Sequence, residues 1–389
     1  MDYIPGFRLR VVLNSDNLSC SNYIFRILHK MKKVLVIFTF LGFLISEGFA
    51  QQNDKSPELN NPKSWSLILI PDTQNYVKFE RNQPILDMMM NWIKENRKKL
   101  NTELVLCVGD LVDQNNNAYP DVIKGDQTST QQWKAVSRSF GKLDHQLPYI
   151  LSTGNHDYGL KNSENRYTQF NSYFPVERNP LTSALLVEMA PNAFGIPTLE
   201  NACYEFKSRH GQKLLIFSLE FAPRKAIIEW CKKLSSLPQY ADHYCIVLTH
   251  SFIRSMLKNN VPIDTEPYPL PDATYGEQLW KQLLYPSDNL RLVFSGHVAD
   301  TDEHKGHVGF HREKNAAGKT VTQMMFNAQR EGGGWNGNGG DGWLRILEFL
   351  PDEKTVQVKT FSPLFALSPA IWHLSWRTES YDQFSFDLR

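Results

Sequence analysis

The stretch LILIPDTQNY, residues 67–76, is apolar for four residues and then turns polar at Pro71 and Asp72. An apolar run that stops at a proline–acid pair is typical of a buried strand that delivers a carboxylate to the end of a sheet. Gln74 is the next residue on the same side of the chain as Asp72, where a histidine would indicate a metal site directly. The rest of the sequence decides whether this amide spoils such a site or belongs to a variant of it.

Four later segments repeat the pattern of a buried strand followed by polar residues, at 103–108, 148–152, 244–249 and 290–295. Each apolar run ends in an acid, an amide or an imidazole. Open α/β sheets place their sites at the carboxyl ends of their strands. We therefore expect one site to gather the polar residues that follow these runs, namely Asp72, Asp110, Asp113, Asn155, His156, His250 and His297.

Helical patterns separate these runs, which indicates an α/β fold with a largely buried central sheet. The helices are expected at 84–99, 132–143, 223–237 and 276–284, and a further strand at 213–219. After His307 the pattern contains strands only, at 319–328, 342–350 and 354–362.

The composition excludes some classes of partner. The chain has 389 residues, a formal net charge of +1 and 41% hydrophobic residues, enough for a large core. Such a balance has no charge excess that would favour nucleic acid or a membrane surface, so we expect no nucleic-acid partner. We also expect a monomer without a stable membrane span. The cysteines after residue 50 permit disulfides without requiring them, and a Cys203–Cys231 bridge is one option.

The first fifty residues differ from the rest. Met31 and two lysines precede the apolar run VLVIFTFLGFLI and the small residues Gly48 and Ala50. This pattern is typical of a signal peptide at 31–50, cleaved after Ala50, and the alternative is an uncleaved anchor. We expect Met31 to be the true start, residues 1–30 to lie upstream of it, 51–63 to be a linker and 64–389 the domain. A secreted or periplasmic protein with Gln51 at its N-terminus would result.

The order Dx(H/Q)…GDxxD…GNHD…H…GH resembles the calcineurin-like metallophosphoesterases over residues 64–363. The glutamine of the first motif and the strand GWLRILEF are similar to the secreted bacterial branch of that family. The resemblance implies a four-layer αββα sandwich, in which two mixed β-sheets are flanked by helices. The strands after His307 would complete the second sheet.

The resemblance also implies a site for two divalent ions (Mn, Mg, Fe, Zn or Ca). Asp110 matches the bridging ligand, Asp72 and Gln74 face the first ion, and Asn155, His250 and His297 bind the second. A metal-bound hydroxide would attack phosphorus. His156 matches the general acid, and Asp113 would hold its imidazolium.

Two positions depart from the family pattern. The first ion commonly has two histidines in the family, and here these positions are Gln74 and Ala299. We therefore expect the first ion to bind weakly, with Mg, Mn or Ca favoured over Zn. Asp300 or His304 would supply a missing ligand, unless the segment 300–311 is simply a polar hairpin.

Arg166 and Trp335 are candidates for substrate contacts. Arg166 would clamp a phosphate, or else be an ordinary surface arginine. Trp335 lies in a glycine-rich segment that fits GxGxxG literally at 337–342 but follows no βα unit, so a loop at the pocket rim is expected. The sequence thus indicates an exported phosphoesterase that acts on a phosphorylated small molecule or an envelope polymer, by mono- or diester hydrolysis. The alternative is a degenerate, single-metal binding protein with little turnover.

Overall fold

Residues 65–70 form the first strand of a computed structural model that describes residues 57–120, 123–301 and 303–388. The expected extension at 1–30, the expected signal at 31–50 and residues 51–56 of the expected linker lie outside these residues. No helix within the described ranges combines the length and apolar character that crossing a bilayer requires.

The described end of the expected linker is bound to the domain. The main-chain N–H groups of Asn60 and Asn61 donate to the carboxylate of Glu348, and Lys359 Nζ donates to the carbonyl of Glu58. The contacts with Glu348 and Lys359 show that the domain begins before residue 64. The polar composition of this segment had instead indicated a linker.

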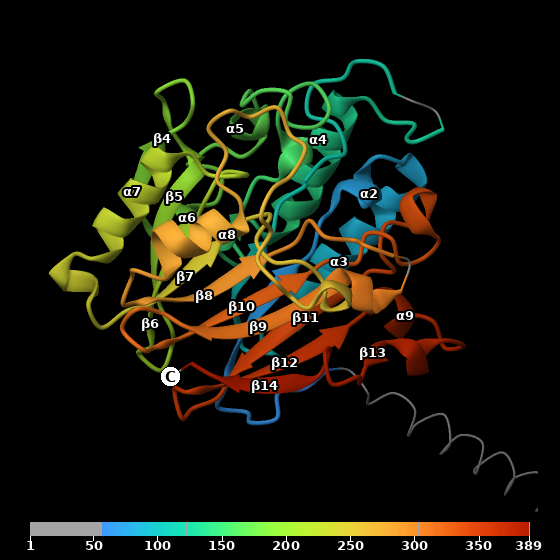
Figure 1. Ribbon diagram of the computed structural model, residues 1–389. Coiled ribbons are helices and arrows are strands. Elements are labelled where there is room, and N and C mark those ends of the chain that lie inside the picture. Colours follow the sequence, from blue (N-terminus) through green and yellow to red (C-terminus); the bar gives the residue numbers. More distant parts are fainter. Residues whose placement is uncertain (1–56, 121–122, 302, 389) are drawn as a thin grey trace, which may run out of the picture. The chain divides into compact units, whose positions relative to one another are not determined.

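The strands form two mixed sheets (Figure 1). Sheet A has the order β13-β12-β11-β1-β2-β3, with β14 also paired to β12. Its strands are β1 (Trp65–Ile70), β2 (Thr102–Cys107), β3 (Tyr149–Leu151), β11 (Leu344–Phe349), β12 (Thr355–Phe361), β13 (Trp376–Arg377) and β14 (Phe384–Asp387). Sheet B has the order β4-β5-β6-β7-β8-β10-β9. Its strands are β4 (Leu186–Pro191), β5 (Pro197–Lys207), β6 (Lys213–Ser218), β7 (Tyr244–Leu248), β8 (Leu290–Ser295), β9 (Val308–Lys314) and β10 (Thr320–Phe326).

The helices begin where local signals favour them. Pro84 lies in the first turn of α3, and a capping box between Thr128 and Gln131 precedes α4. The α-helices of the described chain are α2 (Gln74–Val77), α3 (Gln83–Asn96), α4 (Ser129–Phe140), α5 (Phe170–Tyr173), α6 (Pro180–Ser183), α7 (Lys225–Ser235), α8 (Gly276–Leu279) and α9 (Pro363–Ala366).

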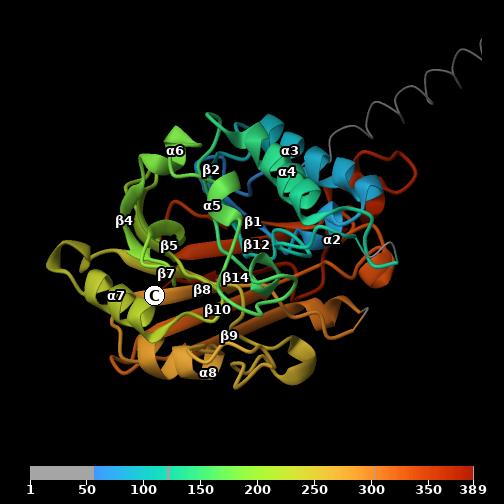
Figure 2. The same cartoon turned by 90° about the horizontal axis from the view of Figure 1, so that it is seen from above.

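The alternation of side chains along β1 shows how the layers stack. Leu67 and Leu69 lie in the core between the two sheets, whereas Ile68 and Ile70 belong to the core beneath α3 and α4. Sheet B likewise buries its other face under α7 and α8. Figure 2 shows these helix pairs on opposite sides of the strands. The expected four-layer αββα sandwich is confirmed.

The strands after His307 do not all complete the second sheet. β9 and β10 join sheet B, but β11 pairs antiparallel with β1 in sheet A, and β12, β13 and β14 follow it there. Leu344 and Ile346 of β11 face the helices, and Leu347 and Phe349 face the inter-sheet core. A strand that is apolar on both faces must be covered on both faces. Pairing with the edge of β1 gives β11 this cover, because sheet A lies between its helices and sheet B.

All cysteines in the described residues are buried free thiols, so the Cys203–Cys231 bridge is not formed.

Candidate metal centre

Four donor atoms from four strand ends converge at one edge of the sheets. His250 Nε2, after β7, lies 3.1 Å from Asp110 Oδ2, after β2, and 3.1 Å from Asn155 Oδ1, after β3. His297 Nδ1, after β8, lies 2.9 Å from Asn155 Oδ1 and 3.2 Å from His250 Nε2. The structure thus brings together the residues that the sequence assigned to the second ion, from both sheets.

The outer nitrogens of the two histidines fix which lone pair faces the centre. His250 Nδ1 lies 2.8 Å from the carbonyl oxygen of Val108, and His297 Nε2 lies 2.6 Å from Glu266 Oε1. Both acceptors require an N–H at these outer nitrogens, which leaves the inner nitrogens of neutral imidazoles unprotonated. Two imidazole nitrogens, an amide oxygen and a carboxylate form a donor set that fits a divalent cation.

Glu266 was not predicted, because it lies in an irregular segment that follows no strand. Burial would raise the pKa of Glu266, but His297 outweighs it and lowers the pKa below its usual range. The carboxylate also accepts a hydrogen bond from Ser251 Oγ, 3.0 Å away. It therefore holds the imidazole of His297 in place as a charged acceptor, as outer carboxylates do at metal sites.

Replacing Glu266 with Ala should weaken divalent metal binding by about 10–100-fold, the usual effect of losing such a partner. Glu266→Gln keeps an acceptor for His297 Nε2 and should lose less. Metal titration into chelator-treated protein by calorimetry measures both, with Glu277→Ala, an exposed acid paired with Lys281, as control. If both Glu266 variants bind metal as tightly as the unmodified protein and the control do, the positioning role is contradicted.

The backbone at the centre is held in conformations that most residues avoid. Asp110 and His297 have φ angles of 48° and 69°, in the left-handed region. Neighbouring glycines leave room for carboxylates: a Cβ at Gly154 would lie 2.1 Å from Asp110 Oδ1, and one at Gly296 would lie 2.2 Å from Asp72 Oδ1. A side chain at either glycine would therefore clash with a carboxylate that belongs to another motif.

The residues assigned to the first ion form a second, amide-rich group beside this one. Asp72 is fully buried, and its Oδ2 accepts hydrogen bonds from Asn327 Nδ2 at 2.8 Å and from Gln329 Nε2 at 3.1 Å. Gln74 Nε2 donates to Gln329 Oε1, while Gln74 Oε1 is buried without a hydrogen-bond partner. A buried oxygen that lacks a donor fits a cation ligand, and no imidazole belongs to this described group.

Asn327 and Gln329 were missed although the sequence carried their signal. They follow β10 as Asp110 follows β2, and β10 runs parallel to β8. The segment after His307 reads as strands only, without the helices that separate parallel strands, so its pattern did not indicate that β10 runs parallel to β8. The general rule for strand ends would have found both residues.

The charge balance at the centre is set by burial. Burial raises the pKa of Asp72 to about 7, since the opposing effect of His250 is smaller. Burial would also raise the pKa of Asp110, but His250 and His156 outweigh it and lower the value to about 2. For His250 burial favours the neutral form, yet Asp110 and Asp72 raise its pKa to about 10. Two buried carboxylates thus demand positive charge, which a divalent cation supplies more fully than one imidazolium.

The carboxylate of Asp157 holds two ligand-bearing loops together. It accepts N–H groups from Gly154 at 2.8 Å, Leu111 at 3.1 Å and Val112 at 3.0 Å. These bonds join the loop after β2 to the loop after β3, so that Asp110 and Asn155 stay within reach of the same centre.

His156 lies next to the centre, but Asp113 does not hold it as expected. The main-chain N–H of His156 donates to Asp110 Oδ1 at 2.9 Å, and His156 Nδ1 lies 2.7 Å from the carbonyl oxygen of Asp113. The Asp113 carboxylate instead pairs with Lys78, 3.7 Å away. Burial would lower the pKa of His156, but Asp110 and Asp113 outweigh it and raise the pKa. Asp113 therefore orients the ring through its backbone and acts on it otherwise by charge alone.

Neither Asp300 nor His304 supplies a ligand to the first group. Asp300 pairs with Lys258 at 2.8 Å and accepts a hydrogen bond from Ser255 Oγ. His304 Nε2 lies 2.9 Å from Asp382 Oδ1. Both side chains point to other partners, so the segment that the sequence offered as a source of the missing ligand belongs elsewhere.

Arg166 is neither a surface arginine nor open to a phosphate. It is buried, and its guanidinium donates to Asp272 Oδ1 and to the carbonyl oxygens of Phe221 and Ala222. It thereby ties together three loops. Trp335 is 45% exposed, with the guanidinium of Arg330 5.2 Å from its ring centroid, on the segment that continues from Gln329.

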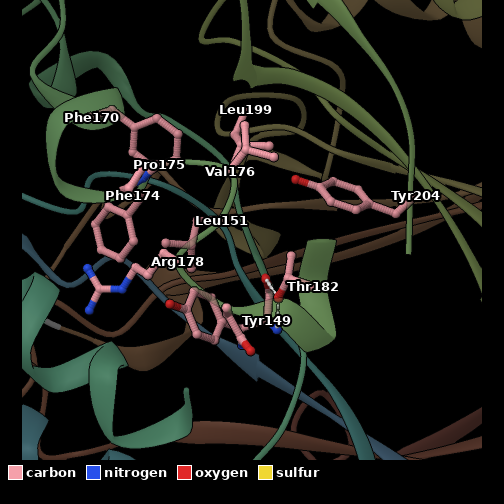
Figure 3. A pocket seen from close by; sticks show the side chains of 11 residues that line it. Tyr149, Leu151, Phe170, Phe174, Pro175, Val176, Arg178, Thr182, Leu199 and Tyr204 are labelled. Carbon is pink, nitrogen blue, oxygen red and sulfur yellow. Dashed lines mark hydrogen bonds between the residues drawn. The ribbon is translucent and has the colours of Figure 1, made fainter. Parts of the chain in front are cut away.

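A small cavity lies between α5, α6, β3 and β5 and contains none of the residues of the metal centre (Figure 3). Its volume is about 20 Å³, which is room for about one water molecule. Tyr149 and Thr182 are hydrogen-bonded to each other at its wall. This cavity is too small to be a substrate site.

Residues 67–301 match the model of the calcineurin-like phosphoesterase family. YvnB of Bacillus subtilis (strain 168), described as an uncharacterized protein, is 28% identical over 341 residues, or 84% of this chain and 22% of YvnB. The chain thus spans about a fifth of the length of this curated relative. The solved structure of GAP50, the anchor in the inner membrane complex of Plasmodium, is 13% identical with a TM-score of 0.39, covering 77% of this chain and 85% of GAP50. This structural likeness is too weak to support any inference about the function of the chain.

Proposed function

Because the chain belongs to the calcineurin-like phosphoesterase family, we propose that it is an exported, metal-dependent hydrolase of phosphomonoesters or phosphodiesters. The observation that carries the proposal is the convergence of Asp110, Asn155, His250 and His297 on one point, with His156 beside it. The pattern at residues 31–50 supports export.

The residues of the centre would hold two divalent ions. Asp110 contacts His250 and its charge acts on Asp72, and it matches the shared ligand of the family, so we assign it to both ions, with Asn155, His250 and His297 on one side. Asp72, Gln74 and Gln329 would hold the other ion more weakly, because amide oxygens bring no charge and nitrogen donors are absent from this described group. Ions bound there activate a water molecule and neutralise the charge of a phosphoryl group.

His156 would act as the general acid of the reaction. With Nδ1–H donating to the carbonyl oxygen of Asp113, Nε2 is the nitrogen that can hold and release a proton. The raised pKa of His156 favours the protonated form, in which Nε2–H donates to the leaving oxygen of the ester. Asp110 contributes to this by its charge and by fixing the His156 backbone.

The proposal is tested with a panel of phosphomonoesters and phosphodiesters after removal of metal by a chelator. We expect no turnover without metal, and recovery when Mn, Mg, Zn or Ca is added. Within this centre one ion should bind tightly, and turnover should rise further as a second is titrated in. The measurements are product release and metal content per chain.

The rival reading, a single-metal binding protein, predicts a different pattern. It would bind one ion and inorganic phosphate, measured by calorimetry, yet leave every ester of the panel intact whichever metal is added. That outcome would replace the hydrolase by a binding function.

A further inference from the structure

A second cluster of potential metal ligands lies outside the centre described above. It consists of His304 and His307, in the 3-10 turn His304–His307 that precedes β9, and Glu331, which follows β10. His304 Nδ1 lies 3.5 Å from Glu331 Oε1, and His307 Nδ1 lies 3.9 Å from the same oxygen. Donors around one tetrahedral zinc ion at 2.0–2.2 Å are separated by about 3.3–3.6 Å. The two histidine nitrogens therefore lie from the Glu331 oxygen nearly as ligands of a single ion would, and all three donor atoms lie within 4.8 Å of one another.

The outer nitrogens of both rings are committed to acceptors. His304 Nε2 lies 2.9 Å from Asp382 Oδ1, and His307 Nε2 lies 2.6 Å from the carbonyl oxygen of Thr301. Each Nε2 must therefore carry the hydrogen, and in the neutral rings the lone pair is at Nδ1. A carboxylate or carbonyl behind each ligating imidazole is the usual arrangement around protein-bound metal ions.

The inner atoms, in contrast, have no well-formed hydrogen bond, and the shortest contact among those quoted is the 3.5 Å pair of His304 Nδ1 and Glu331 Oε1. His304 Nδ1, His307 Nδ1 and Glu331 Oε1 are all buried and unpartnered. The exposed fractions of His304 and His307 are 6% and 0%. His307 Nδ1 faces the carboxylate of Glu331. With both rings neutral, three acceptors face one another in a buried space and repel, which is unfavourable unless a cation lies between them.

We propose that His304, His307 and Glu331 bind a divalent transition-metal ion, with Zn²⁺ as the preferred occupant. Two imidazoles and one carboxylate are a donor set that zinc accepts, with the fourth position left to solvent. This ion is separate from the two of the proposed catalytic centre, with which it shares none of its ligands.

The cluster is connected to the catalytic centre through one short segment. The N–H of Asn327 donates to the carbonyl of His307 at 2.8 Å, and Asn327 and Gln329 contact Asp72. Glu331 ends the same segment, and its other oxygen accepts from Arg377 at 2.8 Å. An ion at the cluster would therefore anchor residues 327–331, which carry two contacts of the first catalytic group, so its role is structural support of that group.

The test uses the full chain with His250→Asn and His297→Asn, which removes both imidazoles of the catalytic centre. This reference variant is treated with chelator, loaded with Zn²⁺ or Co²⁺ and freed of excess metal by gel filtration. We expect it to retain about one ion per chain, to show the visible absorption of nitrogen-ligated Co²⁺, and to melt at a higher temperature with Zn²⁺ than without.

Adding His304→Gln and His307→Gln should reduce the bound metal to less than a tenth and abolish both the Co²⁺ absorption and the Zn²⁺-dependent rise in melting temperature. His311→Gln in the same reference removes a partly exposed imidazole from β9 and should change none of these readouts. If the double replacement fails to fold, Glu331→Gln in the reference preserves size and an acceptor for Arg377. It should weaken Zn²⁺ by more than the 10–100-fold expected for an outer partner.

Two results would overturn the proposal. One is a folded reference variant, shown by a cooperative melt, that retains no ion. The other is metal content and Co²⁺ absorption that stay unchanged when His304 and His307, or Glu331, are replaced. Because the reference variant lacks the catalytic imidazoles, neither result bears on the proposed hydrolase activity.

Discussion

Replacing Asp110 with Asn should lower kcat by at least about 10³-fold and remove the tightly bound ion of the catalytic centre, because this carboxylate is the charged donor that we assign to both ions. Metal ions contribute several kcal/mol of charge stabilisation in such reactions, and each 1.36 kcal/mol corresponds to a factor of ten. Asparagine has nearly the same shape and still accepts from the His156 N–H, so the loss reports charge rather than packing.

The Asp110→Asn variant is compared with Asp352→Asn, which replaces an exposed acid in the turn before β12 and should change neither turnover nor metal content. Metal content is measured by mass spectrometry and folding by thermal melting. A folded variant with the same metal content as the unmodified protein and a kcat within about tenfold of it would show that Asp110 is not a shared ligand.

Replacing His156 with Asn should lower kcat by about 10²–10⁴, the usual contribution of a positioned acid, while leaving metal content nearly unchanged. The ring lies beside the donor cluster without belonging to it, since its Nδ1 is bonded to the Asp113 carbonyl. The loss should shrink for nitrophenyl esters, whose leaving group needs little protonation. His373→Asn, which replaces an exposed histidine, serves as the matched control.

Equal losses for good and poor leaving groups would remove His156 from the role of acid. A large fall in metal content would instead show that the imidazole supports a ligand. Steady-state kinetics with paired substrates, together with metal analysis of the same samples, distinguishes these outcomes.

The strand ends could be predicted from sequence because each obeys a local rule. Asp72, Asp110, Asn155, His250 and His297 each follow an apolar run, and parallel strands bring such ends to a common edge. The structure confirms that these residues lie together. Asn327 and Gln329 obey the same rule. They were not predicted because the sequence does not show that β10 runs parallel to β8.

Other features depend on contacts between distant parts of the chain, which no local pattern carries. The burial of Arg166 is set by loops near residues 221 and 272, and its sequence neighbours give no hint of them. Glu266 reaches His297 from an irregular loop. The division of the late strands between the two sheets was also unpredictable. The apolar pattern of β11 fits either sheet, and its place in sheet A depends on its pairing with the edge of β1.

The pairing of β1 with β11 also bears on the order in which this chain can fold. A polypeptide that emerges N-terminus first presents β1 with an unpaired edge until Leu344–Phe349 has followed it. Asp72 meets Asn327 across 255 residues of sequence, so its surroundings form at the same late stage. Contacts this distant slow folding and leave strand edges exposed to aggregation meanwhile. A chain truncated before β11 should therefore accumulate as an insoluble or chaperone-bound species rather than as a weak enzyme, because sheet A has no closing strand.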